Sequence, residues 1–461
     1  MCPSPHFFGL YSSFFCLRSC LRPMEFARSE PPATAQVARE PRNIACLVAY
    51  QVVARVGWIF KTETVIMPAV LDACIDSGLL RGLLPVLNRA GNSLFPLLIA
   101  RAVARQPTVR WLLALTTTGL AGCFLLLALI WSPLVGPHPH LLAVSFLVIY
   151  AVFSVINGCN QLLVATLQGR LITAGHRGRV LLLSVTIGSV LAITAAVIAL
   201  GPWLHQPNGF HLIFTATGGF FLLAAVVPAF FDEPALRPAT GERPQVVPGG
   251  SPLWSLLKQD PAVVRLALVA AGFSAVLMLF PHYQAYARVQ FGTGSGSLLT
   301  WVIAQNVATG LASLVVGPLA DRRGNRLVLI GLIGCCSVTP LIVVGLSAVP
   351  TQGAAGWFWL AYLPLGLNPI ALRIFSNYAL ELAPTVARQP RYVSLIGAAL
   401  AVPFVFAPLI GWSIDRVGAP PIFLAGAVVI GLATVVAIGL PEPRRGHLAA
   451  TAGNLKGETG L

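Results

Sequence analysis

Charged side chains are scarce in this chain. Only 10% of its 461 residues are Asp, Glu, Lys or Arg, whereas soluble proteins carry about 25%. The mean hydropathy is +0.80. Because the apolar residues form uninterrupted runs of about 20, this deficit excludes a soluble domain and predicts transmembrane helices. Strict alternation of apolar and polar residues is also missing, which argues against an outer-membrane barrel.

Motifs for metal binding and catalysis are missing as well. The nine cysteines form no CxxC pair and have no histidine partners at ligand spacing, so we expect neither a metal site nor a disulfide framework. Cys123, Cys159, Cys335 and Cys336 lie in apolar runs and are expected to pack as small hydrophobic residues. HExxH, GxSxG and P-loop motifs are absent. The sequence therefore predicts no enzyme and no cofactor.

Twelve apolar segments are present. A polar, Pro- and Gly-rich stretch divides them six and six and is typical of a linker. The first 43 residues lack a basic n-region, so a signal peptide is not expected, and Met24 is an alternative start that would leave residues 1–23 untranslated. The predicted organisation is a cytoplasmic tail (1–43), a six-helix bundle (44–231), a cytoplasmic linker (232–261), a second six-helix bundle (262–441) and a cytoplasmic tail (442–461).

The net charge of +15 is distributed unevenly along the chain. Both tails and the loops that follow even-numbered segments hold 23 of the 30 Lys and Arg residues. The loops on the other side hold three, and four lie within segments. The positive-inside rule then places both termini in the cytoplasm. The basic balance reflects topology in a cytoplasmic (inner) membrane, so the lipid bilayer is the expected partner and nucleic acid is not.

One loop carries a motif. Between the eighth and ninth segments the chain reads GPLADRRGNR (Gly317–Arg326). This resembles the signature loop of the major facilitator superfamily, which implies an all-α, polytopic fold of twelve transmembrane helices in two six-helix bundles. The resemblance also implies secondary transport and a conformational latch on the cytoplasmic side. The latch residues would be Gly317, Asp321, Arg322, Gly324 and Arg326, with Asp321 against the start of helix 11, where a helix dipole favours an anion.

The two halves share similar sequences at the ends of corresponding helices, but the Asp-Arg motif occurs in the second half alone. Helix 6 ends in FFDEP and helix 12 in GLPEP, which fits a duplicated bundle with a site at the interface of its copies. The loop between helices 2 and 3 keeps only Arg101, Arg105 and Arg110 and has no Asp-Arg pair. Two symmetric latches are therefore not expected.

Polar residues inside the membrane segments mark the candidate site. A charge in the hydrocarbon layer costs about 2.5–3.5 kcal/mol or more, so such residues need a function or a partner. They fall mainly on helices 1, 4, 7 and 10, which line the central cavity in the superfamily. Interhelical hydrogen bonding is the alternative for the Asn and Gln residues. The candidate substrate-binding residues are Arg55, Glu63, Arg89, Asn157, Gln161, His282, Gln284, Asn368, Arg373 and Asn377.

Glu63 is the carboxylate well inside the first half. Lys61 lies about 200° away on an unbroken helix, so we expect the two not to pair. Glu63 is then either a proton carrier or a counter-ion for Arg55 or Arg89. For His282 the alternatives are a proton relay and a packed, hydrogen-bonded residue.

The predicted cavity is net positive, which favours an anionic or polar solute. We therefore expect a monomeric transporter of a small solute that works by alternating access, facilitative or with protons or ions as candidate coupling partners. A drug or metabolite efflux transporter and a non-transporting membrane sensor on the same fold remain alternatives.

Overall fold

The computed structural model describes residues 33–173, 176–206, 208–234, 256–258, 260–294, 296–349, 351–384 and 388–442. The alternative start at Met24, most of the predicted linker and nearly all of the predicted C-terminal tail lie outside the described residues. Every regular element of the described part is helical. Twelve helical stretches are long and apolar enough to cross a membrane, so the predicted all-α fold with twelve spans is confirmed.

The first half contains six spans, two of which are interrupted. Spans 1 and 5 are each built from more than one helical piece, and span 6 ends in a 3₁₀ turn. In chain order the elements are α1 (Ala33–Phe60), α2 (Ile66–Cys74), α3 (Gly78–Ala104), α4 (Arg110–Leu134), α5 (Pro139–Leu171), α6 (Arg177–Ala195), the π-helix η3 (Ala196–Leu200), α7 (Gly201–Leu204), α8 (Gly209–Val226) and the 3₁₀-helix η4 (Val227–Phe230).

The second half also contains six spans. Spans 10 and 11 are interrupted, each near a proline that cannot continue the hydrogen-bond ladder. The elements are α10 (Pro261–Phe291), α11 (Gly296–Arg323), α12 (Asn325–Ser347), α13 (Thr351–Trp357), the 3₁₀-helix η5 (Phe358–Ala361), α14 (Tyr362–Leu365), α15 (Asn368–Leu382), α16 (Gln389–Ala401), the 3₁₀-helix η7 (Val402–Phe406), α17 (Ala407–Val417) and α18 (Ala419–Ile438).

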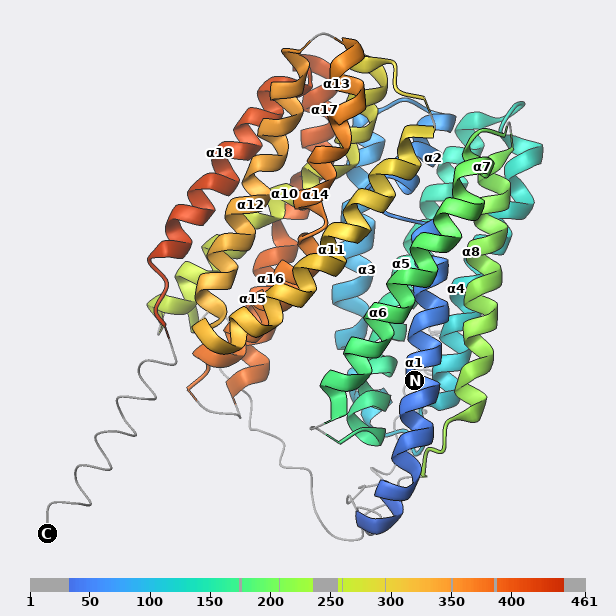
Figure 1. The fold of residues 1–461 in the computed structure, drawn as a ribbon, viewed down its shortest axis with the longest axis vertical. Coiled ribbons are helices and arrows are strands. Elements are labelled where there is room, and N and C mark those ends of the chain that lie inside the picture. Colours follow the sequence, from blue (N-terminus) through green and yellow to red (C-terminus); the bar gives the residue numbers. More distant parts are fainter. Residues whose placement is uncertain are drawn as a thin grey trace, which may run out of the picture.

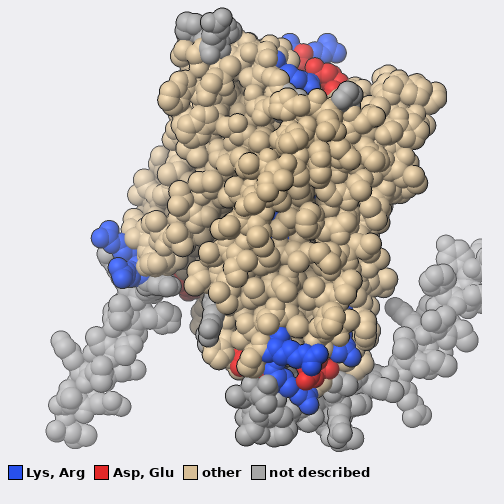
Figure 2. Space-filling view, turned by 45° about the vertical axis from the view of Figure 1, so that its right-hand side comes forward, with Lys and Arg blue, Asp and Glu red and all other residues tan. Residues whose placement is uncertain are grey.

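The surface has the distribution of charge that a bilayer requires. Figure 2 shows a broad band without charged residues on this face, with Lys, Arg, Asp and Glu gathered toward its two ends. Large apolar side chains point outward from this band, and Leu98, Leu115 and Leu129 are each about 70% exposed. Such exposure suits contact with lipid, where helices gain nothing by hiding apolar groups from water. The protein is therefore a multi-pass membrane protein.

Cysteine packing agrees only in part with the expectation. Cys123 and Cys336 are buried, but Cys335 is exposed and Cys159 is half-buried. Their helices face lipid over part of their surface, so a small apolar side chain can lie there without being covered. The cysteines of the described segments are all free thiols.

The two halves lie side by side and meet mainly at one end. We call the end at which α1 begins and α18 ends the inner end, which faces the lower and left-hand side of Figure 1, and the opposite end the outer end. Contacts between halves are dominated by α3 against α17, with further contacts of α10 with α2 and α3 and of α6 with α11. Glycines such as Gly78 and Gly411 let α3 and α17 approach each other closely.

Candidate functional site

A cavity of about 670 Å³ lies between the two halves. This is the size of a site for a small molecule. Span 1 contributes residues from Tyr50 to Thr64, and spans 2, 4, 5, 7, 8, 10 and 11 also contribute. The lining of the first half reaches Gln168 and Ser184, close to the inner ends of α5 and α6. The cavity therefore runs from the middle of the molecule toward the inner end.

Six of the ten predicted site residues line this cavity. They come from α1, the segment after it, α3, α5 and α15. They are Arg55, Glu63, Arg89, Gln161, Asn368 and Arg373. Charged residues from span 1 and span 10 therefore come to one space between the two halves.

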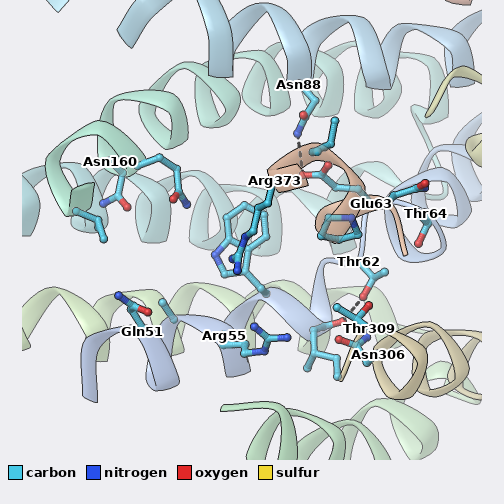
Figure 3. A pocket seen from close by; sticks show the side chains of 18 of the residues that line it. Gln51, Arg55, Thr62, Glu63, Thr64, Asn88, Asn160, Asn306, Thr309 and Arg373 are labelled. Atoms are coloured by element: carbon cyan, nitrogen blue, oxygen red, sulfur yellow. Dashed lines mark hydrogen bonds between the residues drawn. The ribbon is translucent and has the colours of Figure 1, made fainter. Parts of the chain in front are cut away.

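The arginines approach the cavity from opposite halves. Figure 3 shows Arg55 and Arg373 on facing sides of the pocket, with Glu63 and Asn88 to one side. Arg55 comes from α1 and Arg373 from α15. Arg89 of α3 reaches across to the second half, where its guanidinium lies 5.4 Å from the ring centroid of Phe404. Cation–π contact of this kind holds a guanidinium without neutralising its charge.

The predicted separation of Lys61 from Glu63 is wrong. Lys61 Nζ donates to Glu63 Oε1 at 2.6 Å. The prediction assumed an unbroken helix, but α1 ends at Phe60 and α2 begins at Ile66. The turn between them brings the two side chains together, and Thr62 Oγ1 donates back to the carbonyl of Ile59. A break in span 1 thus creates an ion pair that helical spacing forbids.

Lys61 itself is fully buried. Its ammonium lies 3.5 Å from the ring centroid of Trp58 and 4.4 Å from that of Phe153. Glu63 also accepts from Asn88 Nδ2 at 2.8 Å. Glu63 is therefore a counter-ion, as one of its two predicted roles required, but its partner is Lys61 and not Arg55 or Arg89.

Four predicted site residues do not line the cavity. Asn157 donates to Asn92 Oδ1 at 2.7 Å and so joins α5 to α3. Asn377 is exposed, one turn beyond Arg373 along α15. His282 and Gln284 are buried nearer the outer end of α10, each with 1% of its surface exposed. Asn157 thus makes the interhelical hydrogen bond that was its alternative role.

Sequence reasoning also passed over part of the polar lining. The predicted set left out polar side chains that lie within two turns of its members or on spans 5 and 8. They are Tyr50, Gln51, Thr62, Thr64, Asn88, Asn160, Gln168, Ser184, Gln305, Asn306, Thr309 and Ser313. Gln305 and Asn306 stand out as polar residues within an apolar run, which was the available signal. Thr117, Leu120 and Phe221, from the supporting spans 3 and 6, also reach the lining.

Ion pairs join the halves at the outer end. The side chain of Asp72 is fully buried and pairs with Arg81 Nη1 at 2.5 Å. From the other half it accepts from Gln284 Nε2 and pairs with Arg288 Nη2 at 3.4 Å. Arg81 also pairs with Asp76 at 2.6 Å. The predicted site residue Gln284 therefore belongs to this network.

A second contact at the outer end joins α3 to α17. Asp415 accepts from the backbone N–H of Gly78 at 2.8 and 2.9 Å, at the first turn of α3. A Cβ atom on Gly78 would lie 2.3 Å from the carbonyl oxygen of Gly411, so only glycine permits this approach. A Cβ atom on Gly82 would likewise lie 2.4 Å from the carbonyl oxygen of Ala407. We call Asp72, Gly78, Arg81, Gln284, Arg288, Gly411 and Asp415 together the outer closure.

At the inner end the motif loop forms a tight turn between α11 and α12. Gly324 has φ +88° and ψ 156°, a region open essentially to glycine. A Cβ there would lie 2.5 Å from Glu442 Oε1. Arg326 Nη2 donates to the Ile438 carbonyl at 2.6 Å. The side chain of Asp321 lies outside the described residues, so its predicted contact with helix 11 stays a prediction.

The endings FFDEP and GLPEP occupy corresponding places. Glu233 accepts from the backbone N–H groups of Val109 and Arg110, at the start of the third span. Glu442 lies against Gly324, at the start of the ninth span. A carboxylate at a helix N-terminus is stabilised by the free N–H groups and by the dipole. The echo in sequence therefore places a carboxylate beside the start of the third span and of the ninth span, but among the described residues only Glu233 accepts hydrogen bonds from the N–H groups there.

These features define a helical membrane protein with two six-span halves and a solute-sized cavity between them. The family model for the Major Facilitator Superfamily matches residues 64–385. The chain belongs to this superfamily, and it is a transporter of a small solute. A search of curated proteins gives no match.

Solved structures share the fold at low sequence identity. A mutant form of the nucleoside transporter NupG has a TM-score of 0.68 and 10% identity and covers 86% of this chain and 99% of its own. A D-xylose-proton symporter has a TM-score of 0.60 and 12% identity, covering 86% of this chain and 98% of its own. A bacterial homolog of the human lysosomal transporter Spinster, in an inward-facing and unoccupied conformation, has a TM-score of 0.52 and 14% identity, covering 87% and 94%. At these identities the likeness establishes the fold and leaves the solute open.

Proposed function

We propose that this protein moves a small anionic or polar solute across the cytoplasmic membrane by alternating access. The observation that carries the proposal is the charge of the cavity lining, which contains three arginines and one carboxylate. That carboxylate, Glu63, is already bonded to Lys61 and Asn88. A concave site of one charge sign concentrates solutes of the opposite sign, because low-dielectric walls focus the field.

The position of the cavity supports alternating access. Both halves contribute to its lining, so a bound solute would touch groups that move relative to each other. The outer closure blocks one end while the lining runs toward the other. With both termini cytoplasmic, as the distribution of Lys and Arg favours, this arrangement is the inward-facing state. We propose that the protein acts as a monomer, since one chain supplies both sides of the site.

The similar solved structures widen the choice of solute. They carry nucleosides in one case and D-xylose with protons in another. Apolar side chains such as Leu84, Leu277 and Phe280 also line the cavity here, so the solute has a part that tolerates apolar contact. The arginines favour an anionic group on that solute over a lipophilic cation.

Thermal stabilisation of the purified protein in detergent tests this proposal. Succinate, inorganic phosphate, acetate, a hexose, a nucleoside and tetraphenylphosphonium would be compared at equal ionic strength, because a ligand of the native state raises apparent stability. We expect an anion to raise the melting temperature in the parent but not in Arg373→Gln or Arg55→Gln. Arg416→Gln, at the outer end of α17 and outside the cavity, is the charge-matched control. Stabilisation by the lipophilic cation alone would instead favour an efflux transporter.

A further inference from the structure

Two guanidinium groups of the cavity are left without a counter-charge. Arg55 and Arg373 form no ion pair or hydrogen bond with another described residue, and Arg55 Nε is buried without a partner. Arg55 lies on α1 of the first half and Arg373 on α15 of the second. The two groups face each other across the cavity (Figure 3). Like charges that approach each other cost free energy unless something lies between them.

The carboxylate of the cavity cannot neutralise them. Glu63 is held by Lys61 and by Asn88, whose hydrogen bond to Glu63 is drawn in Figure 3. The lining carries three arginines, and the charge of its one carboxylate is balanced by Lys61. Arg89 lies against the ring of Phe404, so Arg55 and Arg373 are the pair that faces the cavity, with two positive charges between them. A solute with two negative charges would balance this pair.

We propose that the solute is a dianion held between Arg55 and Arg373, and that the protein exchanges one such dianion for another instead of moving it alone. This inference rests on the proposed function and deepens it. It follows from what the inner end must do to close. Closure brings the two halves together around the cavity and removes its water.

Water in the open cavity screens the two arginines, and its loss removes that screening. Repulsion between charges grows as the effective dielectric falls, and so does the cost of taking unpaired charges out of water. The empty protein is therefore held with its inner end open. A dianion between the guanidinium groups offsets both costs and lets the halves close. A ligand shifts a conformational equilibrium only through such a difference in affinity between states.

Exchange is the consequence for the transport cycle. If the empty cavity cannot close, the protein passes through the state with both ends closed only when a dianion is bound. This holds for transport in either direction. Each dianion that leaves must then be replaced before the halves can move again. Symport with a cation would need the opposite behaviour, because a symporter returns empty.

A measurement without any solute tests the repulsion directly. Spin labels at Leu182 of α6 and Leu380 of α15, which are 57% and 37% exposed near the inner end, report the separation of the halves. In anion-poor buffer we expect the parent to show one long-distance population. Arg373→Gln should increase the short-distance population at least five-fold, and Arg373→Lys should not. An unchanged distribution in a folded Arg373→Gln protein would overturn the inference, and Arg55→Gln is the replacement if that variant does not fold.

Transport in proteoliposomes tests the exchange. Radiolabelled succinate, inorganic phosphate and acetate are the probes, each outside vesicles that contain the same anion or none. We expect succinate or phosphate uptake to be at least ten-fold faster into loaded vesicles, and acetate to be a poor probe. Equal uptake into empty vesicles, uptake driven by a pH gradient into empty vesicles, or exchange of acetate alone would overturn the inference while leaving an anion transporter. If no anion stabilises or crosses, the proposed function itself fails, and the solute-free distances still decide whether the arginines repel.

Discussion

Asp415 should decide how firmly the outer end stays closed. Its carboxylate lies in the second half but accepts from the backbone N–H groups of Gly78 and Leu79, at the start of α3 in the first half. Arg81 Nη2 is 3.9 Å away. Opening the outer end must break all of these contacts. Replacing Asp415 by Asn keeps the shape of the side chain and removes its charge.

The expected magnitude follows from the geometry. Loss of a side-chain acceptor at a helix N-terminus costs about 0.5–2 kcal/mol, and loss of an anion from the helix dipole costs about 0.3–1 kcal/mol. Asp415 is 37% exposed, so water screens part of the effect. Since asparagine retains one acceptor, we expect the outer-closed state to lose about 1–2 kcal/mol. This corresponds to a roughly 5–30-fold rise in the outer-open population.

Distances between spin labels at the outer end measure this population. Leu141 of α5 and Val289 of α10 are 54% and 74% exposed and lie in different halves. We expect Asp415→Asn to add a longer-distance population at this pair. An identical distribution in the parent and the variant would refute the role given to Asp415.

Asp232→Asn is the matched control. Asp232 forms an exposed ion pair with Arg39 at 3.4 Å, within the first half and at the inner end. Its replacement removes the same charge from the same kind of side chain but breaks no contact between halves. The outer distances should therefore stay as in the parent.

Two further predictions concern stability, both measured by thermal unfolding in detergent. Gly324→Ala should lower the free energy of unfolding by about 1–3 kcal/mol, because its backbone angles suit only glycine. Gly317→Ala in the same motif is the control and should be close to neutral, since no atom lies within 4 Å of the new Cβ. Equal effects of the two substitutions would show that the turn is not strained. Lys61→Gln should lower the free energy of unfolding by about 1–3 kcal/mol. This is less than the roughly 3–5 kcal/mol lost when a fully buried ion pair is broken, because the side chain of Glu63 is 27% exposed. Adding Glu63→Gln should recover at least half of that loss, and a loss that simply adds would mean that the two do not interact in solution.

The sequence was a sufficient guide to the twelve spans because the bilayer imposes them. A backbone crossing hydrocarbon must satisfy its own hydrogen bonds, so apolar length alone identifies a helix. The break between Phe60 and Ile66 was not predicted. No glycine lies in that turn, and the side chain of Thr62 and its carbonyl supply the hydrogen bonds that the helix gives up. Such a break depends on local contacts that an apolar run does not reveal.

The candidate site was predictable where charge lies deep in a span. Arg55 and Arg373 line the cavity as expected, since a deep charge needs water or a partner. His282 does not, although it lies on a predicted cavity helix. It lies about 200° around α10 from the lining residue Phe280, and its ring lies beside Gly411 of α17.

The outer closure was the part that the sequence concealed. Arg81 and Arg288 were counted only as charges of outer loops, and in isolation they resemble solvated ends of helices. Their role depends on Asp72, which Arg288 meets from the other half of the chain at 3.4 Å. Pairs this distant in sequence are brought together only by the packing of α2 against α10. Without knowledge of that packing, neither residue gives a local signal.

The charges at the two ends of the molecule favour the same resting state. At the outer end, opposite charges from the two halves are paired, so separation of the halves there breaks ion pairs. In the cavity, like charges from the two halves face each other, so approach of the halves at the inner end is opposed. Both effects hold the empty protein closed at the outer end and open at the inner end. A bound dianion changes only the second effect, which is why the proposed exchange depends on Arg55 and Arg373 while Asp415 sets how easily the loaded protein then opens outward.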